Sequence, residues 1–168
     1  MKNKSIPYNR VDIQGKEIEY VQEAIINGQI SGDGEFTYKC NRFLEKELGV
    51  HKSLLTTSCT HALEMTAILL DIKPGDEVII PSFTFVSTAN SFVLRGAKPI
   101  FIDIRHDTLN MDETRLEELI TKNTKAIILV HYAGVGCEME PIIEIANKYN
   151  IPVIEDNAHG MFGKYKGR

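Results

Sequence analysis

Apolar residues that recur every three to four positions predict two helices in the first fifty residues. Their apolar positions are Ile18, Val21 and Ile25, then Phe36, Cys40, Phe43 and Leu44. Gly28 and Gly49 follow the last apolar position of each helix, where glycine commonly ends a helix. Between the two helices, Ser31–Gly34 is too rich in glycine to be helical and predicts a turn.

After residue 53 the pattern changes to short apolar runs. The runs are Leu54–Thr57, Val78–Ile80, Ile100–Ile104, Ala126–Val130 and Val153–Ile154. Each is too short for a helix and is apolar on both faces, which is typical of a strand that is covered on both sides. The runs therefore predict the strands of a buried sheet.

Helical patterns fill the intervals between these runs. They cover Ala62–Leu70, Val86–Arg95, a segment from Asn110 to Ile120 with Glu113 as its capping partner, and a segment from Pro141 to Tyr149. Alternating strands and helices predict a three-layer α/β/α fold around a mostly parallel sheet with right-handed crossovers. The chain contains no repeat, low-complexity tract or linker that would divide it into two domains.

The carboxyl ends of the strands are the expected ligand site, because ligands of such sheets bind in the crevice outside those ends. The loops at that edge are Ser58–His61, Pro81–Phe85, Asp103–Asp107, His131–Gly134 and Glu155–Gly160. Functional side chains are therefore expected in these loops.

Composition argues against several classes of function. The chain has 19 Lys and Arg against 23 Asp and Glu, a formal net charge of -4, which argues against a nucleic-acid or membrane-surface binder. Cys40, Cys59 and Cys137 are odd in number and form no CxxC pair, so we expect a reducing compartment with neither disulfides nor a zinc site. Residues 1–10 do not resemble a signal peptide, and no apolar run approaches the roughly 20 residues that span a bilayer. A cytoplasmic protein is therefore expected.

Thr57–Thr60 is expected to end a strand and open a helix. Free backbone N–H groups, the helix dipole and the hydroxyl groups there suit a phosphate dianion. The same residues suit an ordinary helix cap, because Ser and Thr are favoured at that position. The segment lacks the glycines of a GxGxxG or P-loop motif, so a dinucleotide or a nucleoside triphosphate is disfavoured.

Asp156 follows a predicted strand and is expected to face the ligand crevice. A carboxylate there can neutralise the protonated ring nitrogen of pyridoxal phosphate (PLP), whereas a solvated loop acid is the alternative. Phe83 and Phe85 flank Thr84 past a strand end, where an aromatic ring can stack on a planar ligand or simply join the core.

His131 and His159 also lie in loops at this edge. With Asp156 they could resemble a metal site, but no helix carries an HExxH motif, so a metal is disfavoured. A hydrogen bond to an aromatic cofactor or to their own loop is favoured instead. Taken together, a phosphate cradle, a ring stacker and a partner for a ring nitrogen favour PLP over the alternatives.

Five ordered segments of the chain resemble the DegT/StrS-type sugar aminotransferases, which are fold-type I PLP enzymes that aminate keto-sugars attached to nucleotides. The segments are Thr57–Leu63, Gly75–Phe85, Arg95–Pro99, Val130–Gly134 and Glu155–Gly160. The likeness extends from about Asn27 to the end of the chain. It is particularly marked toward the transaminases that form dTDP-4-amino-4,6-dideoxygalactose for surface polysaccharides.

The resemblance implies a set of cofactor-binding residues. They are Ser58, Cys59, Thr60, Phe85, Asp156 and His159. The first three would hold the PLP phosphate, the phenylalanine would stack on the ring, the aspartate would pair with the pyridine nitrogen, and the histidine would lie near the phenolic oxygen. Two positions depart from many relatives, which have Ala in place of Asn157 and Gln in place of His159.

The resemblance also implies an activity, a substrate and an assembly. A homodimer would transfer an amino group, with glutamate as the donor, to the C4 keto group of a dTDP-linked 6-deoxyhexose in lipopolysaccharide biosynthesis. The Schiff-base lysine of the family is expected beyond Arg168, so residues 1–168 would form the N-terminal part of the PLP-binding large domain, without a catalytic residue. A truncated non-catalytic fragment, a PLP-dependent sugar dehydratase with His in place of the lysine, and a nucleotide-sugar binding domain without cofactor are the alternatives.

Overall fold

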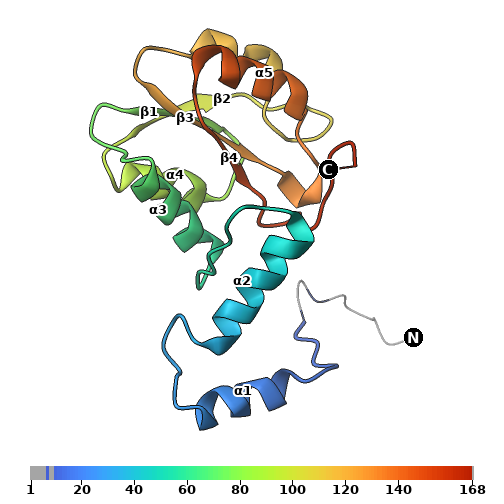
Figure 1. Cartoon of the computed structure of the whole chain (residues 1–168). Coiled ribbons are helices and arrows are strands. Elements are labelled where there is room, and N and C mark those ends of the chain that lie inside the picture. The colour runs from blue at the N-terminus through green and yellow to red at the C-terminus, as the bar shows by residue number, and fades with distance from the viewer. Residues whose placement is uncertain (1–6, 8–9, 168) are drawn as a thin grey trace. The chain divides into compact units, whose positions relative to one another are not determined.

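The computed structural model describes Pro7 and residues 10–167, which form two compact units divided after Leu55 (Figure 1). The sequence contains no linker at this division. The prediction that the first ten residues are not a signal peptide concerns positions that lie almost entirely outside the described residues.

The first unit contains the two helices that the sequence predicts. Helix α1 spans Glu17–Ile26 and helix α2 spans Glu35–Leu48. Gly49 ends α2 with a φ of 64°, in the left-handed region where a residue without a Cβ atom is not penalised. The apolar side chains of α1 are exposed, since none of its residues is buried within the described chain.

The strand predicted at Leu54–Thr57 is wrong, because this segment belongs to no sheet. The backbone N–H of Leu55 donates to the side-chain oxygen of Asn41 at 3.0 Å. That of Ser53 donates to Glu45 at 3.1 Å. These two backbone N–H groups are therefore bonded to side chains of α2 and are not available to a neighbouring strand.

The second unit is built on a parallel sheet, as predicted. Its strands are β1 (Glu77–Pro81), β2 (Lys98–Ile102), β3 (Thr124–Val130) and β4 (Val153–Asp156). They lie in the order β2-β1-β3-β4, and each neighbouring pair is parallel. All four carboxyl ends therefore meet at one edge.

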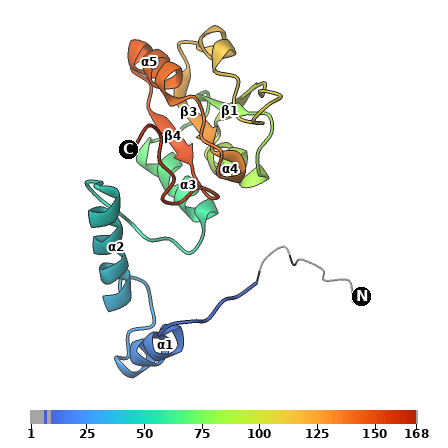
Figure 2. The same cartoon turned by 90° about the vertical axis from the view of Figure 1, so that its right-hand side faces the viewer.

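Helices cover both faces of this sheet, which confirms the three-layer fold (Figure 2). They are α3 (Cys59–Leu69) and α4 (Val86–Val93) on one face and α5 (Met139–Tyr149) on the other. Successive residues of β1 point to opposite faces, so Val78 and Ile80 pack with the helix residue Phe92 in one core cluster. Ile79 packs with Ile142 of α5 in the other cluster.

The helix predicted from Asn110 to Ile120 is replaced by two short 3-10 helices, Glu113–Arg115 and Glu117–Leu119. Asn110 does not cap a helix, because its side chain accepts from the backbone N–H of Tyr132 and donates to the carbonyl of Val135. The cap is Asp112, which accepts from the N–H two residues later. The side chain of Asn110 is therefore bonded to the loop at residues 132–135 and is not available to cap a helix.

No helix among Pro7 and residues 10–167 has the length and apolar character needed to cross a bilayer. Cys40, Cys59 and Cys137 are all free thiols.

Candidate functional site

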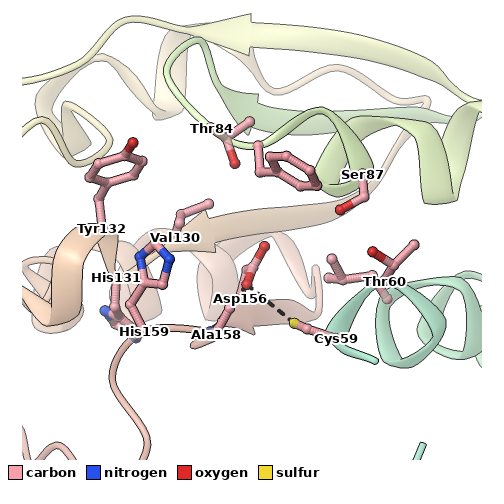
Figure 3. A pocket seen from close by; sticks show the side chains of 12 residues that line it. Cys59, Thr60, Thr84, Ser87, Val130, His131, Tyr132, Asp156, Ala158 and His159 are labelled. Carbon is pink, nitrogen blue, oxygen red and sulfur yellow. Dashed lines mark hydrogen bonds between the residues drawn. The ribbon is translucent and has the colours of Figure 1, made fainter. Parts of the chain in front are cut away.

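A pocket of about 210 Å³ lies at the carboxyl ends of the strands, entirely within the second unit (Figure 3). Four of the five predicted loops line it, and the loop Asp103–Asp107 does not. Five of the six predicted cofactor-binding residues are in its wall: Cys59, Thr60, Phe85, Asp156 and His159. Ligand pockets typically enclose about 300–1,000 Å³, so these residues form part of a site rather than a closed cavity.

Ser58, the remaining predicted residue, caps helix α3. Its hydroxyl oxygen accepts from the backbone N–H of His61 at 3.1 Å. The N–H groups of Cys59 and Thr60, in the same first turn, have no acceptor within the helix. The segment can therefore cap the helix and bind an anion at the same time. The hydroxyl of Ser58 caps the helix, and the backbone N–H groups of Cys59 and Thr60 are free to donate to an anion.

Asp156 ends β4 and is 6% exposed. Its Oδ2 accepts from the hydroxyl of Thr88 at 2.8 Å. Its Oδ1 accepts from the backbone N–H of Ala158 at 3.3 Å and from the thiol of Cys59 at 3.5 Å. A buried carboxylate is costly unless it is hydrogen-bonded, and these donors meet that requirement. Asp156 is therefore not a solvated loop acid.

The thiol of Cys59 points at this carboxylate, as the dashed line in Figure 3 shows. Burial, followed by the negative charge of Asp156, raises the pKa of the thiol to about 11. The sulfur is therefore protonated near neutral pH and acts as a hydrogen-bond donor rather than as a nucleophile.

The two aromatic candidates have different surroundings. Phe83 packs against Tyr132, with ring centroids 4.5 Å apart, and does not line the pocket. Phe85 is the N-cap residue of α4, lines the pocket and is 70% exposed. Its ring is thus the one available to a flat ligand.

The hydrogen bonds of the two histidines fix which nitrogen carries the proton in the neutral ring. His159 Nδ1 accepts from the N–H of Ala133 at 3.2 Å, so Nε2 is left as a donor. His131 Nδ1 accepts from the N–H of Cys137 at 3.1 Å, and Nε2 donates to Glu155 at 2.9 Å. That bond lowers the pKa of Glu155.

Within the described ranges, no group of three or more acidic, histidine or cysteine side chains is arranged to hold a metal ion.

Sequence reasoning missed two threonines that support the site. Thr88 is fully buried in the first turn of α4 and bonds to Asp156, 68 residues away. Thr84 lines the pocket and donates to Thr88 at 2.9 Å. The sequence shows their spacing of four residues but not their partner, because Asp156 belongs to β4, a distant strand.

The chemistry of this donor set fits PLP. One end of the pocket offers helix N–H groups and the Thr60 hydroxyl, which suit a phosphate. The buried carboxylate of Asp156 lies beside this turn and suits a protonated ring nitrogen, and Phe85 provides an apolar face. Figure 3 shows Thr60 and His159 on opposite sides of Asp156.

A sequence model of the DegT/DnrJ/EryC1/StrS aminotransferase family matches residues 11–168. The chain is 38% identical to the UDP-4-amino-4-deoxy-L-arabinose–oxoglutarate aminotransferase of Shewanella sediminis over 167 residues, 99% of this chain and 43% of that protein. It is 38% identical to the GDP-perosamine synthase of Caulobacter vibrioides over 156 residues, covering 93% of this chain and 42% of that protein. The chain thus spans less than half the length of these curated relatives.

A solved structure of Escherichia coli GDP-4-keto-6-deoxy-D-mannose-3-dehydratase with bound hydrated PLP has the same fold. The TM-score is 0.89 and the identity 24%, over 98% of this chain and 43% of that one. At this identity the likeness concerns the fold alone.

Proposed function

This chain belongs to the DegT/DnrJ/EryC1/StrS aminotransferase family, and from that membership we propose that it is part of a PLP-dependent aminotransferase acting on a nucleotide-linked keto-sugar. One observation carries the proposal. Thr60, Phe85 and Asp156 are far apart in sequence, and they line the same pocket.

In this proposal each side of the pocket holds a different part of PLP. The first turn of α3, with Ser58, Cys59 and Thr60, binds the phosphate. Phe85 covers one face of the ring, and the Nε2–H of His159 lies near the phenolic oxygen. Bound PLP would supply an electron-poor ring that stabilises negative charge on the reacting carbon.

Asp156 has the central role, because it would keep the ring nitrogen protonated. Its three hydrogen-bond donors hold the carboxylate in place before a ligand arrives. A preorganised charge of this kind does not have to reorient during the reaction, which is why such groups contribute strongly to catalysis.

The substrate is the finer part of the proposal. We take it to be a dTDP-linked 4-keto-6-deoxyhexose, with glutamate as the amino donor, in the synthesis of a surface polysaccharide by a cytoplasmic homodimer. Support comes from the ordered segments that resemble this branch of the family. The two relatives carry UDP and GDP in their names, so family membership by itself leaves the nucleotide open.

Residues 1–168 would form the N-terminal part of the PLP-binding large domain, and the lysine that binds the cofactor covalently would lie beyond Arg168. A polypeptide limited to these residues is then expected to have no transaminase activity. A sugar dehydratase is the second candidate, because the lysine or histidine that would decide between the two reactions is expected beyond Arg168.

The direct test is to incubate the full-length protein with PLP, glutamate and dTDP-, UDP- or GDP-linked 4-keto-6-deoxyhexose, and to measure 2-oxoglutarate and the sugar product. We expect one 2-oxoglutarate per amino sugar, with dTDP as the preferred nucleotide. A deoxygenated sugar without an amino group would indicate the dehydratase, and no conversion of any nucleotide sugar would refute the proposal.

A further inference from the structure

We infer that Thr88 is a positioning residue that orients the Asp156 carboxylate, so that its one remaining acceptor position is available to a protonated ring nitrogen in the pocket. The inference rests on the proposed function, because it concerns how that site holds its cofactor. It is carried by the hydrogen-bond directions around Thr88 and by its complete burial.

The direction of the hydrogen bonds through Thr88 is fixed by counting protons. A hydroxyl has one hydrogen to donate. Thr88 donates it to Oδ2 of Asp156 at 2.8 Å, and its oxygen accepts from the hydroxyl of Thr84 at 2.9 Å. Successive hydrogen bonds polarise one another, so the bond from Thr84 strengthens the bond that Thr88 donates to Asp156.

The number of hydrogen bonds that the Asp156 carboxylate can still accept follows from a similar count. An ionised carboxylate offers about four acceptor positions. Three are taken by Thr88 of α4, the N–H of Ala158 and the thiol of Cys59 in α3. Because these donors come from three different segments, the carboxylate cannot rotate without breaking at least one of the bonds. One position remains for a ligand N–H.

A purely local role for the Thr88 hydroxyl does not explain this geometry. Elsewhere in the chain, Ser91 donates to the carbonyl of Ser87 at 2.8 Å and Thr66 to that of Leu63 at 2.7 Å, each within its own helix. Hydroxyl groups inside helices commonly bond in that way. Thr88 instead bonds across to β4, at the residue that faces the pocket.

The test compares PLP binding by the full-length protein with that of three variants. Thr88→Val keeps the shape and removes the hydroxyl, Thr88→Ser keeps the hydroxyl, and Ser91→Ala removes a hydroxyl that bonds only within α4. We expect Thr88→Val to weaken PLP binding about tenfold, as the loss of one bond to a charged group would. It should also shift the pH dependence of the bound cofactor's absorption, whereas Thr88→Ser and Ser91→Ala stay within about twofold of wild type.

Thr84→Val provides a second variant if Thr88→Val does not fold, and it should move both readouts in the same direction by a smaller amount. The inference would be overturned if Thr88→Val had the PLP affinity and pH dependence of the wild type, or if Ser91→Ala lost as much affinity as Thr88→Val. Either result would leave the proposed function intact as long as the wild type binds PLP. If only Thr84→Val can be measured, unchanged affinity and pH dependence in that variant would overturn the inference as well. A wild-type protein that does not bind PLP would overturn both.

Discussion

The carboxylate of Asp156 is almost fully buried and receives three hydrogen bonds, although it stands at the edge of a sheet where loops begin. The sequence predicts Asp156 as the partner of a ring nitrogen but also allows a solvated loop acid. Only the structure separates these two possibilities, because the burial depends on Thr88 and Cys59, which come from two other helices.

Replacing Asp156 by Asn in the full-length protein should lower kcat for the amino transfer by at least about a hundredfold, since a neutral amide cannot hold the proton on the ring nitrogen. Steady-state kinetics with saturating PLP measure this effect. Glu155→Gln is the matched control, because Glu155 is adjacent in sequence but bonds to His131 and does not line the pocket. A rate near that of the wild type in Asp156→Asn would remove the residue from this role.

The Cys59 thiol should react slowly with iodoacetamide near neutral pH. Its pKa is raised to about 11 from an ordinary 9.0, first by burial and then by the charge of Asp156. A raised pKa lowers the fraction of thiolate near neutral pH, so alkylation should be at least about tenfold slower than in an unfolded peptide. Peptide mass spectrometry of the alkylated protein measures the rate.

The Asp156→Asn variant gives this prediction its control. Without the carboxylate charge the pKa of Cys59 should fall, although burial continues to raise it. Alkylation of Cys59 should therefore become faster in the variant at the same pH. An unchanged or slower rate would show that the carboxylate does not act on this thiol.

At the level of elements, the first turn of α3 combines a cap with an anion site. Ser58→Ala should lower the free energy of unfolding by about 1 kcal/mol, because the N–H of His61 loses its acceptor. Ser58→Asp keeps an acceptor at the cap but places a negative charge beside the proposed phosphate site. It should retain stability in urea unfolding and still bind PLP more weakly. Equal PLP affinity in Ser58→Asp would argue against a phosphate at this turn.

The turn from Asn157 to Gly160 carries His159, and its shape depends on the glycine. A Cβ atom at Gly160 would lie 2.2 Å from the side-chain oxygen of Asn157, whose amide donates to the carbonyl of Gly160 at 3.1 Å. Gly160→Ala should cost about 1 kcal/mol of stability by displacing that amide. In the Asn157→Ala background the same substitution should cost less, which a double-mutant cycle measures. Additive effects would contradict the account.

Most elements could be predicted from the sequence, because the strands and the long helices repeat apolar residues at regular spacing. The two failures have a common cause. Leu54–Thr57 is kept out of a sheet by the side chain of Asn41, and Asn110 is kept from capping a helix by the loop at residues 132–135. These are contacts between distant parts of the chain, which a local pattern does not contain.

At the scale of the whole molecule, the strand order explains which loops form the pocket. The sheet runs β2-β1-β3-β4, so β2 lies at the opposite edge from β4 and Asp156. The loop after β2, Asp103–Asp107, is accordingly the predicted loop that does not reach the pocket. The sequence predicts that strand ends converge, but it does not give the order of the strands.

The central claim is that Asp156, Phe85 and the first turn of α3 hold the same cofactor molecule. A crystal structure of the full-length protein with PLP tests it most directly. We predict that the pyridine nitrogen lies within hydrogen-bond distance of the Asp156 carboxylate, with Phe85 on the ring and the phosphate at Cys59 and Thr60. A cofactor whose ring nitrogen faces another group, or whose phosphate lies away from α3, would contradict the account.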